Sequence, residues 1–173
     1  MTDLTAWRGR TVVITGGNSG IGLRAGQALH KAGADVVLAC RDVARSQAVA
    51  GGMTVRALDL TDLDSVASFA SGTDKVDALV CNAGVMGGPM LMTSQGFERQ
   101  MGTNHLGHAA LIAQLFPKLG QIVIISSIAA RGGTLGPQMT AHELVNPPAY
   151  DPGMVYANTK HANRLFATTL RRR

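Results

Sequence analysis

The sequence of 173 residues predicts an α/β fold, a doubly wound parallel sheet within a single domain over residues 1–173. Apolar runs of strand length alternate along the chain with longer segments of helical periodicity, as they do in α/β proteins. Most of these runs are nearly continuous in Val, Ile and Leu, which is the pattern of parallel strands covered on both faces. Hydrophobic residues make up 46% and charged residues 16% of the chain, a globular rather than a disordered balance.

Five short apolar runs are expected to form the strands, because each has strand length and is bounded by polar or turn-forming residues. They cover residues 11–15, 35–40, 54–58, 78–81 and 121–126. Four segments with apolar residues close to a 3.6-residue spacing are expected to be helices. They cover residues 21–32, 62–70, about 96–116 and about 155 to the C-terminus. Gly33 follows the first helix as a C-terminal cap should, and Pro117 ends the third.

The last helical pattern is still running where the sequence ends. A right-handed crossover helix normally leads the chain into a further parallel strand. The strand at 121–126 is therefore expected near a sheet edge, with the last strands of the fold missing. Since an unpaired apolar edge strand promotes association, we expect an N-terminal portion of a longer fold that forms homo-oligomers.

Composition argues against several classes of protein. The net charge of +5 includes the terminal run Arg171, Arg172 and Arg173. Nucleic-acid binding would require a basic stripe with aromatic side chains for stacking, and the sequence contains none, so we do not expect it. Cys40 and Cys81 each end an apolar run and are expected to be reduced core thiols. No stretch approaches the roughly 18 apolar residues of a membrane span, and no signal peptide is visible. We therefore expect a cytoplasmic protein that does not bind membranes.

A glycine-rich turn, Thr15-Gly-Gly-Asn-Ser-Gly-Ile-Gly22, follows the first expected strand and opens the first helix. Glycines let the backbone turn sharply and let a diphosphate approach, while free N–H groups and the helix dipole face the anion. Its place inside a β-α-β unit predicts a Rossmann-like fold that binds a dinucleotide. The residues expected to contact this cofactor are Gly16, Asn18, Ser19, Gly20, Ile21 and Gly22.

The end of the second strand reads Ala39-Cys40-Arg41-Asp42 and bears on the choice of cofactor. This point of the fold meets the adenosine ribose, where an acid selects NAD and a cation binds the 2′-phosphate of NADP. The planar guanidinium of Arg41 suits a phosphate, so NADP is favoured over NAD. The alternative is that Arg41 is a solvated loop residue and that Asp42 caps the next helix.

Tyr156 and Lys160 form a Tyr-x-x-x-Lys pattern near the C-terminus. On a helix, residues i and i+4 share a face, so the phenol and the ammonium converge on one site. A neighbouring cation favours phenolate, and Tyr156 is therefore expected to donate a proton in reduction and to accept one in oxidation. Lys160 is expected to assist it and to bind the ribose hydroxyls of the cofactor.

The order of these motifs resembles the short-chain dehydrogenase/reductase family over nearly the whole chain. Glycines at 16, 20 and 22 are followed by Asn82-Ala83-Gly84, by Ser126-Ser127 at a strand end, and by the Tyr-x-x-x-Lys pattern. The end of the second strand and the stretch from Tyr156 onward look like the retinol dehydrogenases and the WW-domain oxidoreductases. In that branch a long loop before the tyrosine helps to shape the substrate pocket.

The resemblance implies further cofactor-binding residues. Asp59 would contact the adenine and Leu60 would line its pocket, although a helix-initiating turn is an alternative for these two residues. Asn82 and Ala83 would lie beside the cofactor, with Asn82 bridging backbone groups. Gly84 would permit close approach. Cys81, just before them, stands where the family's motif has an asparagine.

The resemblance also implies two more catalytic residues. Ser127 would orient the substrate oxygen, with Ser126 in a structural role. Asn104 would interrupt its helix and hold a water that links Lys160 to solvent. His105 and His108 nearby are spaced i, i+3 without a third ligand, so no metal site is expected.

The sequence as a whole predicts an NADP-dependent oxidoreductase. Such an enzyme transfers a hydride between the nicotinamide cofactor and an alcohol or carbonyl substrate. Two alternatives are a redox-sensing NAD(P)-binding protein without turnover and a catalytically inactive nucleotide-binding fragment. Redox sensors of this kind tend to lose the tyrosine or the lysine, whereas both are present here.

Overall fold

The computed structural model describes residues 4–171, which fall into two compact units. The first unit comprises Met1–Asp59, Asp64–Ala83 and Leu111–Val123, and the second comprises Leu60–Leu63, Gly84–Ala110 and Ile124–Arg173. The single domain expected from the sequence stays a prediction. Arg172 and Arg173, at the end of the expected terminal helix, lie outside the described residues.

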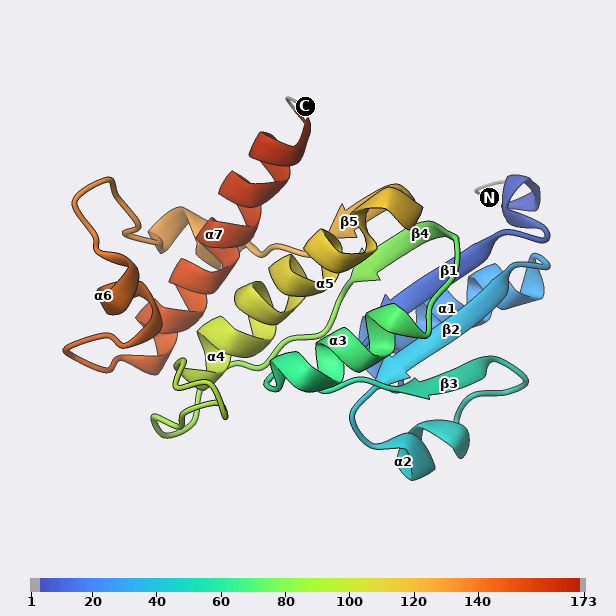
Figure 1. Ribbon diagram of the computed structural model, residues 1–173, viewed down its shortest axis with the longest axis horizontal. Coiled ribbons are helices and arrows are strands. Elements are labelled where there is room, and N and C mark those ends of the chain that lie inside the picture. Colours follow the sequence, from blue (N-terminus) through green and yellow to red (C-terminus); the bar gives the residue numbers. More distant parts are fainter. Residues whose placement is uncertain (1–3, 172–173) are drawn as a thin grey trace. The chain divides into compact units, whose positions relative to one another are not determined.

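The sheet has five strands in the order β3-β2-β1-β4-β5 (Figure 1). The strands are β1 (Thr11–Thr15), β2 (Asp35–Cys40), β3 (Thr54–Ala57), β4 (Val76–Cys81) and β5 (Leu119–Ile124). β1 pairs in parallel with both β2 and β4, and β2 pairs in parallel with β3. The predicted α/β fold with a parallel, Rossmann-like sheet is confirmed, and β5 lies at a sheet edge as expected.

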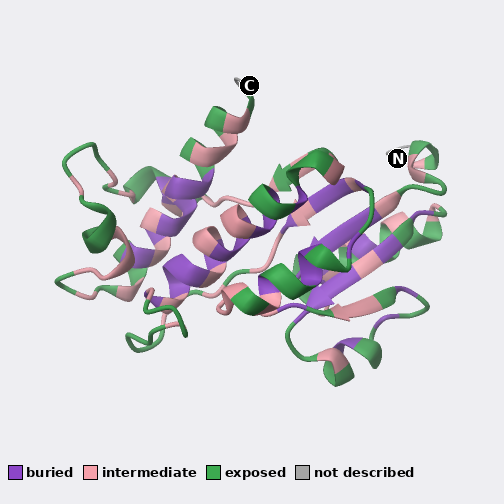
Figure 2. Ribbon diagram, in the orientation of Figure 1, coloured by how far each residue is buried: buried purple, intermediate pink, exposed green. Residues whose placement is uncertain are grey.

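Packing in the first unit explains why the central strands are so apolar. Figure 2 shows β1, β2 and β4 as mostly buried. Ile14 and Leu38 are fully buried in a cluster to which helix α1 (Gly20–Lys31) contributes Leu23, Ala25 and Leu29. Figure 1 shows α1 and α3 (Leu63–Ser71) on opposite faces of the sheet, the layering of a doubly wound fold.

Two short helices were not among those expected. They are α2 (Val43–Gln47) and α6 (Ala141–Val145). Asp42 caps α2, because its carboxylate accepts from the backbone N–H of Arg45 at 2.9 Å. A reciprocal capping box between Thr140 and Glu143 opens α6. The Thr-x-x-Glu spacing that forms this box is visible in the sequence and predicts a helix start.

The helical segment expected over about 96–116 begins at Arg99 and is divided into three parts. They are α4 (Arg99–Met101), a π-helical turn η2 (Gly102–Leu106) and α5 (Gly107–Leu115). The short 3₁₀ turn η3 (Phe116–Lys118), which contains Pro117, follows α5. The side chain of Asn104 in η2 bonds to backbone outside the helix, as described below, and π-helical turns are frequent at functional sites.

The last strand ends earlier than expected, at Ile124 instead of Ser126. The carbonyl of Ile125 accepts from Lys160 Nζ and from Asn163 Nδ2, each at 3.2 Å, rather than from a neighbouring strand. Both donors lie on α7 (Pro152–Arg171), which begins a few residues before the expected helix. Beyond the end of β5, side chains of α7 therefore donate the hydrogen bonds that the Ile125 carbonyl accepts.

Both cysteines are free and buried, as predicted. Burial raises the pKa of the Cys81 thiol to about 12, so it stays protonated. Among residues 4–171, no helix is long and apolar enough to cross a membrane.

Candidate active site and cofactor loop

The glycine turn after β1 has a backbone conformation that residues other than glycine rarely adopt. Gly16 and Gly20 have φ angles of +61° and +53°, a left-handed conformation that glycine adopts most readily. A Cβ on Gly16 would lie 2.9 Å from Ala83 Cα, whereas nothing lies within 4 Å of one on Gly20. Ser19 precedes α1 without capping it through its side chain. The first N–H groups of α1 therefore lie beside an open glycine backbone, which suits an anion.

Thr15 and Asn82 join this turn to the end of β4. The fully buried Thr15 Oγ1 accepts from the backbone N–H groups of Asn82 and Ala83, each at 3.0 Å. Asn82 Nδ2 donates to the carbonyls of Thr15 at 2.9 Å and Gly16 at 3.3 Å. A Cβ on Gly22 would collide with the Asn82 amide. Asn82 thus bridges backbone groups as expected, and Thr15 is a residue that the sequence analysis missed.

Replacing Thr15 with valine is expected to destabilise the protein by about 2–4 kcal/mol. Valine matches threonine in shape but leaves the N–H groups of Asn82 and Ala83 without their acceptor. Urea denaturation of the wild type and the variant measures the difference. Thr15→Ser keeps the hydroxyl and should lose about 1 kcal/mol or less, the cost of a small core truncation. Equal losses in the two variants would show that the hydroxyl is unimportant.

The two charged residues that follow β2, Arg41 and Asp42, have different surroundings. The Asp42 carboxylate caps α2, so the capping role suggested as an alternative for this residue is confirmed. Arg41 is exposed and makes no hydrogen bond or ion pair with the residues that the structure describes. The guanidinium of Arg41 is therefore free to bind a ligand, while the neighbouring carboxylate is occupied by backbone.

Asp59 and Leu60 follow β3, one in each unit. The backbone N–H of Asp59 donates to Ser65 Oγ at 3.0 Å, which is a contact at the start of α3. Leu60 is 6% exposed, and its carbonyl lies so close to Gly107 that a Cβ there would collide with it. These contacts agree with the helix-initiating alternative for Asp59 and give Leu60 a packing role. Their contact with adenine stays a prediction.

In the second unit, Tyr156 and Lys160 lie together on α7. Lys160 Nζ is 5.6 Å from the centre of the Tyr156 ring, within the range of a cation–π contact. Lys160 is only 4% exposed, and burial lowers its pKa. Its ammonium donates to the Ile125 carbonyl at 3.2 Å. The convergence expected from the i, i+4 spacing is therefore present in the structure.

Asn104 connects α7 to the segment that follows β4. Its Oδ1 accepts from the Val85 N–H at 2.8 Å, and its Nδ2 donates to the Val85 carbonyl at 2.9 Å and to Thr159 Oγ1 at 3.1 Å. The carbonyl of Asn104 accepts from Asn163 Nδ2 at 3.1 Å. The expected interruption of the helix at Asn104 is confirmed, and the water-holding role stays a prediction. Thr159 and Asn163 are further residues that the sequence analysis missed.

Gly84 lies against the same group of side chains. A Cβ on Gly84 would be 3.3 Å from Asn104 Oδ1 and 3.5 Å from Lys160 Nζ. The first distance is shorter than most Cβ contacts and the second is an ordinary van der Waals contact. The absence of a side chain at Gly84 therefore lets the backbone lie close to both polar groups. The close approach of a cofactor expected at Gly84 stays a prediction.

The two serines after β5 have different partners. Ser126 Oγ donates to the Lys160 carbonyl at 2.8 Å, which is a structural contact. Ser127 caps the 3₁₀ helix η4 (Ile128–Gly132), where its Oγ accepts from the Ala129 N–H at 3.2 Å. Within residues 4–171 no hydrogen bond joins Ser127 to the phenol of Tyr156. The structure therefore brings Tyr156, Lys160, Asn104 and Gly84 into one group of contacts but does not link Ser127 to them directly.

His105 and His108 make packing contacts in the second unit. His105 Nδ1 lies 3.0 Å from Asn163 Oδ1, and its ring meets Phe166 edge to face. His108 is 3% exposed, and its Nδ1 lies 3.2 Å from the Asn104 carbonyl. Burial is the main cause that lowers the pKa of His108 to about 4. Among the described residues, no three His, Cys, Asp or Glu side chains gather as metal ligands.

The buried His108 predicts a loss of stability in weak acid. Its pKa is about 4 when folded and about 6.5 when unfolded, so the unfolded chain binds more protons between these values. The free energy of unfolding should therefore fall as the pH drops through this window, by about 2 kcal/mol at pH 5. His108→Asn keeps a polar group but cannot titrate there. Denaturation at pH 7 and pH 5 should show a smaller loss for this variant, and equal losses would contradict the prediction.

The parallel sheet, the glycine turn and the Tyr–Lys helix together define a Rossmann-like nucleotide-binding fold. A family model described as short chain dehydrogenase matches residues 10–140. The chain therefore belongs to the short-chain dehydrogenase/reductase family, whose members are typically oxidoreductases of CH–OH groups that use NAD(P).

Individual relatives agree with this assignment. The chain is 39% identical to human retinol dehydrogenase 11, over 95% of this chain and 56% of that protein. It is 40% identical to a probable oxidoreductase of Streptomyces lividans, over 98% of this chain and 60% of that protein. The chain thus spans somewhat more than half the length of these relatives.

Solved structures extend the comparison. An uncharacterized protein from Mycobacterium paratuberculosis matches with a TM-score of 0.89 and 42% identity, over 96% of this chain and 63% of that chain. Pseudomonas aeruginosa RhlG, in an active-site complex with NADP, matches with a TM-score of 0.75 and 25% identity, over 98% of this chain and 69% of that chain.

Proposed function

We propose that the protein is an NADP-dependent oxidoreductase that interconverts an alcohol and a carbonyl compound. The observation that carries this proposal is the buried Lys160, whose ammonium lies 5.6 Å from the centre of the Tyr156 ring. Burying a lysine in this way is costly, and a structural lysine would be expected to reach solvent. A cation held beside a phenol is instead what proton transfer by tyrosine requires.

The residues of the first unit fit a dinucleotide. A side chain at Gly16 or Gly22 would collide with the Asn82-Ala83 segment, and the backbone at Gly20 is open. The start of α1 adds N–H groups and a positive dipole end for a diphosphate. The residues of this unit that would contact the cofactor are Gly16, Asn18, Ser19, Gly20, Ile21, Gly22, Asp59, Asn82 and Ala83. Leu60, Gly84, Tyr156 and Lys160 of the second unit complete the proposed set.

When bound, the nicotinamide supplies or accepts the hydride. The phenol of Tyr156 donates a proton to the carbonyl oxygen in reduction, and its phenolate accepts the alcohol proton in oxidation. Lys160 stabilises the phenolate through its charge. The Ser127 hydroxyl orients the substrate oxygen by a hydrogen bond. Asn104 is a positioning residue, because its amide binds the Val85 backbone and the hydroxyl of Thr159, which precedes Lys160 on α7.

Arg41 supports NADP as the cofactor rather than NAD. Its guanidinium is exposed without a partner among the described residues, and the only acid beside it in sequence, Asp42, is occupied as a helix cap. A free guanidinium suits the 2′-phosphate, whereas a free carboxylate would suit the 2′-hydroxyl. The similarity to RhlG, solved with NADP, supports the same choice.

The substrate class is proposed only as an alcohol or carbonyl compound. Retinol appears in the names of three kinds of relative, retinol dehydrogenases 11, 12 and 14, so retinal is the first carbonyl to assay. The test is NADPH oxidation with a panel of aldehydes and ketones that includes retinal. Absence of turnover with every carbonyl, together with absence of NADPH binding, would contradict the proposal. The cytoplasmic location and the homo-oligomer expected from the sequence stay predictions.

A further inference from the structure

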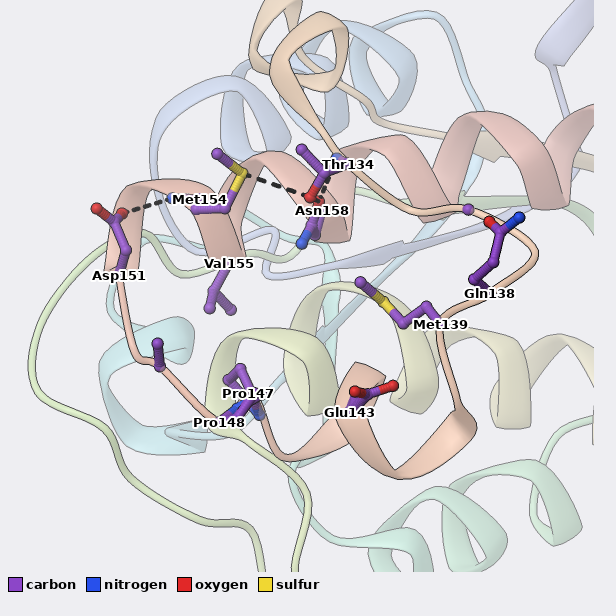
Figure 3. Close-up of a pocket in the computed structure, with 12 residues that line it drawn as sticks. Thr134, Gln138, Met139, Glu143, Pro147, Pro148, Asp151, Met154, Val155 and Asn158 are labelled. Atoms are coloured by element: carbon purple, nitrogen blue, oxygen red, sulfur yellow. Dashed lines mark hydrogen bonds between the residues drawn. The ribbon is translucent and has the colours of Figure 1, made fainter.

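The second unit contains a pocket between α7 and the segment that leads to it (Figure 3). Its volume is about 440 Å³, within the range of small-molecule sites. Figure 3 shows the lining residues coming from the start of α7, from the loop around Met139 and from α6 with the two prolines after it. The apolar part of the wall includes Met139, Pro147, Met154 and Val155. Methionine side chains adapt to ligands of different shape.

This pocket lies on the far side of α7 from Tyr156 and Lys160. Each residue of an α-helix is rotated by about 100° from the one before it, so residues two positions apart lie on nearly opposite faces. Tyr156 therefore lies nearly opposite Met154, and Lys160 nearly opposite Asn158. Met154 and Asn158 line the pocket, whereas Tyr156 and Lys160 do not. Met154 and Asn158 also contact the incoming segment, where Thr134 N donates to Asn158 Oδ1 at 2.7 Å. The pocket is thus separate from the group of residues assigned to proton transfer.

The charged side chains of the pocket are both acidic. Glu143 and Asp151 line it, and none of its described lining residues is Lys, Arg or His. Hydrogen bonds from Thr140 lower the pKa of Glu143, so its carboxylate is charged at neutral pH. Asp151 Oδ1 accepts from the Met154 N–H at 2.7 Å and is held in place as the cap of α7. Figure 3 shows Glu143 beside Met139, with Asp151 at the other end of the pocket, and a carboxylate beside an apolar wall complements a ligand with an apolar body and a positive charge.

We infer that this pocket is a second ligand site, which binds a small apolar amine on the face of α7 opposite Tyr156. The ammonium of the ligand pairs with Glu143, which lies beside Met139 in Figure 3, and its apolar body packs between Met139, Met154 and Pro147. The site uses none of the residues assigned to proton transfer or cofactor binding, so its test does not depend on the proposed oxidoreductase function.

The test follows the methyl signals of Met139 and Met154 by NMR in protein labelled at the methionine methyl carbons. Met139→Leu and Met154→Leu assign the two signals. The probes are 2-phenylethylamine, 2-phenylethanol and phenylacetate, which share a ring but differ in charge. We expect saturable shifts of both signals, with a Kd on the order of 1 mM for the amine. The alcohol should bind about fivefold more weakly, as expected for loss of one partly solvated charge pair, and the acid more weakly still.

Two variants separate the parts of this proposal. Glu143→Gln combined with Asp151→Asn removes both charges but keeps residue types that cap helices, so the advantage of the amine over the alcohol should disappear while both still bind. Ala149→Trp places a large ring at an exposed position of the pocket lining and should abolish binding of all three probes. The inference is overturned if neither methionine signal shifts, if the acid binds as well as the amine, or if binding survives in the tryptophan variant. The readout is binding rather than turnover, so it is independent of the proposed function.

Discussion

Replacing Tyr156 with phenylalanine is expected to lower kcat by at least about 100-fold, the scale of general acid–base catalysis. The change removes one hydroxyl and keeps the ring beside Lys160 Nζ. Because the variant keeps the aromatic ring and all of Lys160, NADPH affinity should change much less than kcat. Steady-state kinetics with the best carbonyl of the panel, together with a fluorescence titration of NADPH, measures both quantities.

The only other tyrosine in the chain, Tyr150, provides a matched control. Its hydroxyl receives a hydrogen bond from Gln100 Nε2 at 3.3 Å and donates to backbone carbonyls of the loop at Gly88. Tyr150→Phe should therefore change the unfolding midpoint more than kcat. If Tyr156→Phe keeps full activity, or if the two variants lose activity equally, Tyr156 is not the proton donor.

Removing the side chain of Arg41 is expected to weaken NADPH binding by about 10- to 100-fold, the effect of losing a hydrogen bond to a charged group. The affinity for NADH should change less than about twofold, because NADH has no 2′-phosphate for the guanidinium to bind. Titration of wild type and Arg41→Ala with both cofactors gives the four dissociation constants. Equal losses for the two cofactors would show that Arg41 does not recognise the phosphate.

Arg45 offers the matched control for this experiment. It lies four residues further along the chain, in α2, and is exposed like Arg41. Arg45→Ala lowers the net charge by the same amount, so it reports the general electrostatic attraction between protein and cofactor. The difference between the two variants is the part that belongs to Arg41. Repeating both titrations at higher salt should reduce the effect of Arg45→Ala, because exposed charges are screened.

The sequence was sufficient to predict the sheet and the cofactor turn, because both depend on short-range patterns. A run such as Thr11–Thr15 is apolar enough to be a strand wherever it pairs, and all five strands lie within about two residues of the expected positions. Glycine likewise permits the positive φ angles found at Gly16 and Gly20, which other residues rarely adopt. The i, i+4 spacing of Tyr156 and Lys160 was enough to place both on one helix face.

Elements that depend on distant partners were predicted less well. Helical periodicity over 96–116 gives no sign of a π-helical turn, because that turn is accompanied by hydrogen bonds from Asn104 to Val85 and Thr159, far away in sequence. The end of β5 depends in the same way on Lys160 and Asn163, which bond to the Ile125 carbonyl from another helix. No local pattern contains these pairings.

Local patterns in the sequence were enough to predict the alternation of five strands with the longer helices, the glycine turn and the polar residues that the family requires. These features arise from backbone sterics and hydrophobic periodicity within a few residues. Which polar groups have partners became visible only once distant segments were packed together. Asp42 is a helix cap while Arg41 is free, Thr15 is the acceptor that joins β1 to β4, and Lys160 is buried beside Tyr156. Hydrogen bonding and desolvation act through space, and they are set by neighbours that are distant along the chain.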